Sequence, residues 1–182
     1  MSIALILIDI QNDYFPGGAM EVVGATAAAD QAAKLLTAFR QKGLPVIHVQ
    51  HIAARAGATF FLPGTTGAEI HESVRPNQGE PVFQKHFPNS FRETPLLDYL
   101  RKEGISRLVI AGMMTHMCID TTTRAAADLG FSCSLVHDAC ATRALSFKGI
   151  QVSAGNVQAS YLAALNGLFA QVMFANEVVF DL

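Results

Sequence analysis

The sequence is poor in cysteine, and this shortage excludes several classes of protein. Its 182 residues include three cysteines, Cys118, Cys133 and Cys140, and no two of them form a CxxC pair. An odd number of widely spaced cysteines argues against a disulfide framework and against a structural zinc site. Free thiols are typical of a reducing compartment, so we predict a cytoplasmic protein.

Charged side chains are also scarce and show no strong excess of one sign. They make up 15% of the chain, the formal net charge is −2, and there is no run of basic residues. We therefore expect neither a nucleic-acid partner nor adsorption to an acidic membrane. Because hydrophobic residues reach 51%, we expect part of the apolar surface to be buried in a homodimer or homotetramer.

Long hydrophobic runs are missing as well. No apolar run approaches the roughly 18 residues of a membrane span. The apolar start of the chain lacks a basic flank and is interrupted by Asp9. We therefore interpret it as a buried first strand rather than a signal segment.

Short apolar runs alternate with helical patterns along the chain. Strands are predicted at residues 3–8, 44–50, 81–84, 107–112, 131–136 and 171–174. Helices are predicted at residues 26–42, 95–104, from about 115 to 130, and 153–170. This alternation predicts an α/β fold, a three-layer αβα sandwich around a mainly parallel sheet of roughly six strands, in one domain covering residues 1–182. Residues 51–79 are predicted to be a long loop, and such loops are often functional.

Three reactive side chains follow three of the predicted strands. Asp9 ends the first strand, Lys85 ends the third, and Cys118 follows the fourth. In parallel α/β sheets, binding and catalytic sites form at the carboxyl ends of the strands. We therefore expect these three side chains to meet at one edge of the sheet.

The chemistry of these residue types suits nucleophilic catalysis. A cysteine attacks as a thiolate, and its pKa falls at a helix N-terminus or near a cation. If Thr115 caps the following helix, Cys118 lies in its first turn, and Lys85 adds a positive charge. Asp9 would carry the proton, and the N–H groups of Met114 and Cys118 would hold an oxyanion.

Each of these residues also has an ordinary structural interpretation. Cys118 could fill the core, Asp9 could accept backbone hydrogen bonds in a turn, and Lys85 could lie on the surface. Cys133 is predicted to be a core residue and Cys140 a packing residue in a loop.

Two histidines and one aspartate near other strand ends are further candidates for site residues. His48 and His51 are expected to point to opposite faces of a strand, so they cannot share a metal ion. Asp138 is either a second acid or, more in keeping with its position after a strand, a turn-forming aspartate.

Several segments together resemble the isochorismatase-like cysteine hydrolase family, which includes nicotinamidases and N-carbamoylsarcosine amidohydrolases. The matching segments are ALILIDIQNDYF, the stretch from Gln84 to Phe131 with GMMTHMCID, and LVHDACAT. The resemblance implies a catalytic triad of Asp9, Lys85 and Cys118. It also implies a cis peptide bond at Met113–Met114 that turns the Met114 N–H toward an oxyanion.

Departures from the family pattern narrow the expected activity. Metal-dependent nicotinamidases carry a DxH segment after the second strand, whereas this chain reads QHIAARAG there. We therefore expect no metal site and no cofactor. Isochorismatases that cleave a vinyl ether resemble the chain in fold but lack the cysteine nucleophile.

The sequence thus predicts a hydrolase that cleaves a small-molecule carboxamide or related C–N bond through a thioester. Vinyl ether or ester hydrolysis, or a catalytically silent binding protein, are the alternatives. A nucleotide-binding protein is disfavoured because no GxGxxG follows the first strand. Substrate-binding residues are predicted from their closeness in sequence to the triad or from the long loop: Phe15, Phe60, Phe61, His86, Phe87, Thr115 and His116.

Overall fold

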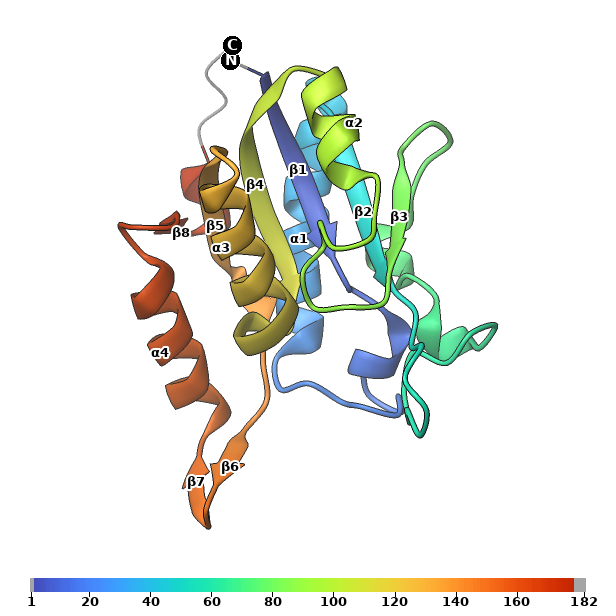
Figure 1. Cartoon of the computed structure of the whole chain (residues 1–182), viewed down its shortest axis with the longest axis vertical. Helices are drawn as coiled ribbons and strands as arrows, with labels where there is room; N and C mark the ends of the chain where they lie inside the picture. Colours follow the sequence, from blue (N-terminus) through green and yellow to red (C-terminus); the bar gives the residue numbers. More distant parts are fainter. Residues whose placement is uncertain (1, 179–182) are drawn as a thin grey trace.

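The centre of the molecule is a parallel six-stranded sheet (Figure 1). The structure is a computed structural model that describes residues 2–178. The strands run in the order β3-β2-β1-β4-β5-β8 and every neighbouring pair is parallel. They are β1 (Ser2–Ile8), β2 (Val46–His51), β3 (Val82–Lys85), β4 (Ile105–Met113), β5 (Ser132–Ala141) and β8 (Gln171–Met173). The predicted fold class is confirmed.

Helices cover both faces of this sheet, so the molecule has three layers. One face packs against α1 (Ala25–Gln41), which lies behind the sheet in Figure 1. The other face packs against α2 (Leu96–Lys102), α3 (Asp120–Asp128) and the end of α4 (Ala154–Leu165). Short helical turns complete the chain: η1 (Asn12–Tyr14), η2 (Thr66–Ala68), η3 (Glu72–Val74), η4 (Thr115–Ile119) and η5 (Ala175–Glu177).

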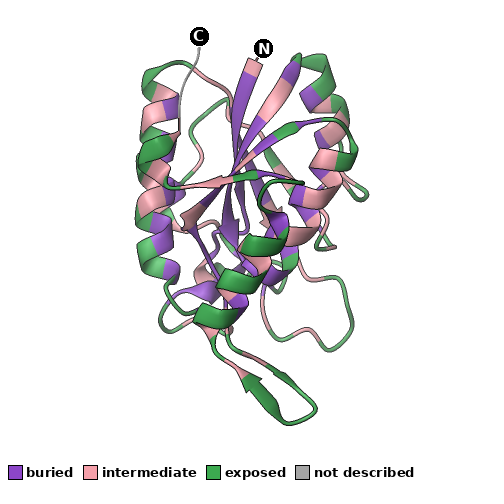
Figure 2. Ribbon diagram, turned by 90° about the vertical axis from the view of Figure 1, so that its left-hand side faces the viewer, coloured by how far each residue is buried: buried purple, intermediate pink, exposed green. Residues whose placement is uncertain are grey.

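Burial explains why the strands are almost continuously apolar. In β1, the residues from Ile3 to Ile8 are all buried, because helices cover the sheet on both sides. Figure 2 shows these buried strands at the centre and exposed residues on the outer faces of the helices. The helix α1, by contrast, is buried on one side only. Its buried residues, such as Ala28, Leu35 and Phe39, form one stripe that faces the sheet.

The C-terminal third differs from the prediction in three elements. The strand β5 continues to Ala141, because the β4–β5 register shifts and lets Gly112 pair with Cys140. Cys140 is therefore buried in a strand, and the prediction that it lies in a loop was wrong. Asp138 also lies within β5 and accepts a hydrogen bond from the Ala175 N–H, so it does not form a turn.

The structure also differs from the prediction at the end of the last helix and in a hairpin before that helix. The helix α4 ends at Leu165, not at residue 170, because Gly167 turns the chain with a φ of +89°. An unpredicted hairpin, β6 (Leu145–Phe147) and β7 (Ile150–Val152), projects from the body of the molecule in Figure 1. Its two-residue turn, Lys148-Gly149, has positive φ at both residues, as a tight hairpin turn requires.

One glycine fixes how closely two central strands approach beside the predicted site. Gly112 in β4 lies opposite Ile8 in β1 and has a φ of +135°. A Cβ atom at this position would lie 1.9 Å from the Ile8 carbonyl oxygen. Only glycine therefore lets β4 lie this close to the residue before Asp9.

Two other sequence predictions can be checked against the fold. Within residues 2–178, no helix is both long and apolar enough to cross a membrane. The helix α2 begins at Leu96, with Pro95 at the cap position, one residue later than predicted.

Candidate active site

The three predicted catalytic side chains come from the carboxyl ends of three different segments. Asp9 directly follows β1 with a φ of +54°, and Lys85 is the last residue of β3. Cys118 belongs to η4, the helical turn that follows β4. Between β1 and β3 lies β2, whose last residue, His51, pairs directly with Lys85 in the parallel ladder.

The ammonium group of Lys85 joins these segments. Its partners are Asp9 Oδ2 at 2.7 Å, His51 Nδ1 at 3.0 Å and Cys118 Sγ at 3.2 Å. The side chains of Lys85 and Asp9 are 0% exposed, so the ion pair between them is sheltered from water. The structure therefore brings a carboxylate and a thiol into contact with one ammonium group, and the three segment ends meet at one edge of the sheet.

Burial controls the resting protonation of the thiol. Burial and the Asp9 carboxylate raise the pKa of Cys118, and they outweigh the lowering effect of Lys85. Burial alone would lower the pKa of Lys85, but the charge of Asp9 and the sulfur of Cys118 raise it overall. The prediction of a lowered cysteine pKa was therefore wrong, because it considered the cation but not the desolvation and the carboxylate. The raised pKa favours a neutral Cys118 thiol beside the Asp9–Lys85 ion pair.

One oxygen of Asp9 has no hydrogen-bond partner among the described residues. Oδ2 accepts from Lys85, whereas Oδ1 is fully buried and unpaired. An unpaired buried carboxylate oxygen is costly unless a proton or a ligand donor reaches it during function. Because a carboxylate oxygen of Asp9 lies within 4.8 Å of Cys118 Sγ, this group is suited to take the thiol proton.

The turn that carries Cys118 agrees with the prediction in one respect and differs in another. The Met113–Met114 peptide bond is cis, as predicted. Thr115 was predicted to cap a helix, but its hydroxyl instead donates to the Ala141 carbonyl oxygen at 3.2 Å. The chain forms a π-helical turn from Thr115 to Ile119, and the regular helix α3 begins only at Asp120. A regular helix was predicted from about residue 115, and no sequence pattern indicated this wider π-helical turn.

A cavity of about 390 Å³ is lined by neighbours of the three side chains, whereas Asp9, Lys85 and Cys118 are not among its wall residues. It is bordered by His51, which contacts Lys85, and by Met114 and Met117, which precede Cys118 in the chain. Two predicted substrate-binding residues, Phe60 and His86, line it. The remaining wall residues come from separate loops: Met20, Ala53, Ala54, Arg55, Gly57, Ala58, Thr59 and Arg143.

The other five predicted substrate-binding residues lie outside the wall of this cavity. Phe15 is stacked on the His71 ring, and Phe61 is buried against other aromatic rings. The ring of Phe87 packs under the guanidinium of Arg92. His116 is bonded to the Thr142 hydroxyl, and Thr115 to the β5 backbone.

Sequence reasoning missed His51 and Arg143 as candidate functional residues. His51 had been considered only as a metal ligand with His48. The structure confirms that the two do not share a site, because His48 contacts Glu80 and His51 contacts Lys85. The position of His51 at the end of the strand next to Lys85 was the available signal. For Arg143 there was none, since a loop brings it to the cavity.

Three side chains around Lys85 could in principle hold a metal ion. Asp9, His51 and Cys118 each offer one ligand atom, and these atoms lie within 4.8 Å of one another. The Lys85 ammonium, however, is bonded to all three side chains. A metal cation bound by them would have to displace a positive charge that is already buried there, so this residue set does not fit a metal ion.

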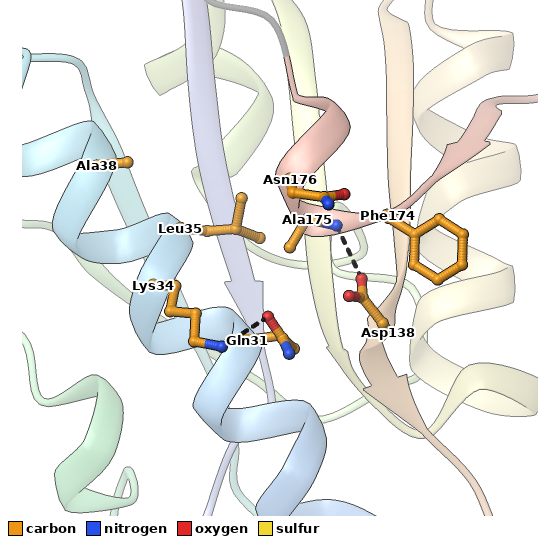
Figure 3. A pocket seen from close by; sticks show the side chains of 8 residues that line it. All are labelled: Gln31, Lys34, Leu35, Ala38, Asp138, Phe174, Ala175 and Asn176. Carbon is orange, nitrogen blue, oxygen red and sulfur yellow. Dashed lines mark hydrogen bonds between the residues drawn. The ribbon is translucent and has the colours of Figure 1, made fainter.

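A second cavity, of about 410 Å³, lies between α1 and η5 (Figure 3). Its polar groups serve local structure, since the Asp138 carboxylate accepts from the Ala175 N–H and the Lys34 ammonium donates to the Gln31 side chain. No cysteine or histidine is among the described residues that line it. It therefore offers no nucleophile for the chemistry considered above.

Similarity to known proteins identifies the family to which this chain belongs. The chain matches the Isochorismatase domain family over residues 3–173. It is 52% identical over 172 residues to the uncharacterized isochorismatase family protein YddQ of Bacillus subtilis, covering 94% of this chain and 96% of that protein. It is 27% identical over 174 residues to the nicotinamidase of Escherichia coli, covering 75% of this chain and 82% of that protein.

Solved structures show the same relationship. The crystal structure of a proposed isochorismatase hydrolase from Oleispira antarctica has a TM-score of 0.93 and 53% identity, covering 97% of this chain and 95% of that chain. The N-carbamoylsarcosine amidase of Thermoplasma acidophilum has a TM-score of 0.83 and 25% identity, covering 99% of this chain and 100% of that chain. The resemblance inferred from the sequence motifs is confirmed.

Proposed function

Because this chain belongs to the isochorismatase family of hydrolases, we propose that it cleaves a small-molecule carboxamide or related C–N bond through a thioester on Cys118. The observation that carries the proposal is the Lys85 ammonium, which contacts both the Asp9 carboxylate and the Cys118 sulfur in a buried site. A base, a cation and a thiol in contact are the parts that an activated cysteine nucleophile needs.

The first half of the proposed reaction forms the thioester. Cys118 Sγ attacks the carbonyl carbon while its proton passes to Asp9, so the site keeps the same total charge. Lys85, 3.2 Å from the sulfur, stabilises the developing thiolate. The N–H groups of Met114 and Cys118 hold the oxyanion, and Asp9 then gives its proton to the departing nitrogen. The C–N bond breaks and ammonia or an amine leaves.

The second half regenerates the enzyme. A water molecule attacks the thioester carbonyl and gives a proton to Asp9. The same N–H groups hold the second oxyanion, the C–S bond breaks, and the proton returns to the sulfur as the carboxylic acid leaves. The raised pKa of Cys118 supports a proton transfer to Asp9 during the attack rather than before it.

The cavity favours a substrate that carries a negative charge. Its charged wall residues are Arg55 and Arg143, and no Asp or Glu is among the described residues that line it. The Nε of Arg143 is buried and has no acceptor within residues 2–178. A carboxylate on the substrate would supply one, and a charge-assisted hydrogen bond of this kind contributes about 1.5–3 kcal/mol.

A matched pair of amides tests this substrate class. Succinamate carries one carboxylate, and succinamide is its neutral counterpart. We expect Arg143→Gln to raise KM for succinamate by about tenfold to 100-fold and to change KM for succinamide little. An equal effect on both amides would contradict the assignment of Arg143 to an anionic group.

The proposed reaction itself is tested by an ammonia-release screen over small amides, ureides and carbamoyl compounds. Cys118→Ala is expected to abolish turnover while the circular dichroism spectrum stays unchanged. Vinyl ether and ester substrates are assayed in parallel by chromatography of their products, because their cleavage releases no ammonia and separates the alternative hydrolases from an amidase. Retained activity in Cys118→Ala would exclude the thioester mechanism.

The assembly state and the location in the cell stay proposals. We propose a homodimer or homotetramer in the cytoplasm, acting on a small molecule. Phe147 and Ile150 on the projecting hairpin are 70% and 66% exposed, which supports burial against another subunit. Light scattering in solution tests the assembly, and a monomer would contradict it.

A further inference from the structure

The Lys85 ammonium has three hydrogens, and three acceptors surround it. They are Asp9 Oδ2, His51 Nδ1 and Cys118 Sγ. An ammonium group donates hydrogen bonds and cannot accept them. His51 Nδ1 must therefore carry a lone pair, so the imidazole is neutral and its hydrogen is on Nε2.

The surroundings of the imidazole agree with this neutral form. Burial, followed by the positive charge of Lys85, lowers the pKa of His51 to about 4. The ring therefore stays an acceptor throughout the neutral range. Its contact with Lys85 is a hydrogen bond to a neutral base and not a repulsion between two cations.

We propose that His51 is a positioning residue, which holds the Lys85 ammonium between Asp9 and Cys118 by accepting its third hydrogen bond. This inference rests on the proposed function of Lys85. A lysine side chain is a point charge on a flexible stem, so its position depends on its partners. Without His51, one N–H of a buried ammonium would lack an acceptor, at a cost of about 1–3 kcal/mol.

The loss of that acceptor would reach the nucleophile through Lys85. The bond to Asp9 Oδ2 is 2.7 Å and charge-assisted, whereas the bond to Cys118 Sγ is 3.2 Å. A lysine released from its third partner is therefore expected to follow the carboxylate and to move away from the sulfur. The thiolate that forms during attack would then lose its cation.

The backbone of His51 is itself held by Gln11, the last residue of the motif Asp9-Ile10-Gln11 that follows β1. Gln11 Oε1 accepts the His51 N–H at 2.7 Å, and Gln11 Nε2 donates to the His51 carbonyl oxygen at 2.9 Å. The same amide donates to Ala68 O at 2.7 Å. Gln11 thus continues the hydrogen bonding of β2 past its end, and the β2–β3 register places His51 beside Lys85. This gives the glutamine of the motif a physical role that its sequence position alone did not reveal.

Two substitutions separate an acceptor role from simple packing. In His51→Asn, the side-chain oxygen can lie near the former place of Nδ1 and accept from Lys85. In His51→Leu, a side chain of similar size offers no acceptor. We expect His51→Leu to lower kcat about 100-fold with less than a threefold change in KM, and His51→Asn to stay within about tenfold of the wild type.

A second readout does not depend on turnover. Iodoacetamide reacts with the Cys118 thiolate, so its rate against pH reports how well Lys85 stabilises that anion. We expect this pH profile to move upward by about one pH unit in His51→Leu and to stay near that of the wild type in His51→Asn. Thermal unfolding of both variants checks the fold. If His51→Leu does not fold, His51→Ala with and without added imidazole replaces it, and imidazole is expected to restore the rate.

The outcomes distinguish this inference from the proposed function. If the wild type hydrolyses no amide but the alkylation profiles follow the expected order, the proposed function fails and the positioning role stands. If amides are hydrolysed but the leucine and asparagine variants behave alike, or the leucine variant stays within threefold of the wild type in kcat, the positioning role is overturned.

Discussion

Replacing Lys85 with methionine tests whether the buried ion pair determines both stability and chemistry. The substitution keeps the side-chain volume but leaves Asp9 as a carboxylate with no counter-charge. At the 2.7 Å separation of Nζ and Oδ2, an effective dielectric constant of about 20 gives a Coulomb attraction of about 6 kcal/mol. Removing the ammonium also removes its own desolvation cost, so the net loss expected in the free energy of unfolding is about 3–5 kcal/mol.

The loss should depend on pH. In Lys85→Met, the folded state favours a protonated Asp9, whereas the unfolded chain holds a carboxylate in the neutral range. The variant therefore binds more protons when folded, and its free energy of unfolding should rise as pH falls from 7 toward 5. Urea unfolding followed by circular dichroism at both pH values measures this change.

A double-mutant cycle provides the control. Asp9→Asn alone leaves the ammonium buried without its carboxylate and should cost a similar amount. The double variant Asp9→Asn/Lys85→Met buries no unpaired charge at this place. Its free energy of unfolding should therefore lie within about 2 kcal/mol of that of the wild type. A loss below about 1 kcal/mol in Lys85→Met, or a double variant equal to the sum of the two single changes, would refute the reasoning.

Three further predictions address the backbone, the thiol and the outer edge of the sheet. Gly112→Ala is expected to lower the free energy of unfolding by about 2 kcal/mol or more, because its Cβ would meet the Ile8 carbonyl oxygen at 1.9 Å; an unchanged urea midpoint would contradict this. Because burial raises the pKa of Cys118, its alkylation by iodoacetamide should be slow at pH 7 and accelerate only above about pH 9, and a rate plateau below pH 7 would reveal a resting thiolate. The hydrogen bond from Arg40 holds the pKa of Glu80 at about 2 rather than 4.5, so this pair stabilises the fold above about pH 4.5 and the stabilisation is lost as pH falls toward 2. Glu80→Gln should flatten the pH dependence of unfolding in that range.

The sequence by itself determined the strand ends and therefore the approximate site. Apolar runs marked the strands because a parallel sheet is buried on both faces. Asp9 lies at the end of such a run and Cys118 follows another, whereas Lys85 ends β3, a short and partly exposed strand at the edge of the sheet. A parallel sheet brings its carboxyl ends to one edge, so the meeting of these side chains followed from topology.

Only the tertiary structure decided the pKa of the Cys118 thiol and the further residues that contact the three side chains. The raised pKa of Cys118 depends on burial and on its distance from Asp9, which no local pattern encodes. His51 became a partner of Lys85 through the β2–β3 register and the bonds of Gln11 to its backbone.

The cavity wall shows the same division. Phe60 and His86 line the cavity as expected, but Phe15 stacks on His71 elsewhere, and Arg143 reaches the cavity from a loop after β5. A strand end is marked by the end of a short apolar run, which is a local property of the chain. A loop side chain is placed by contacts with residues far away in sequence, so its position is settled only when the whole chain has folded.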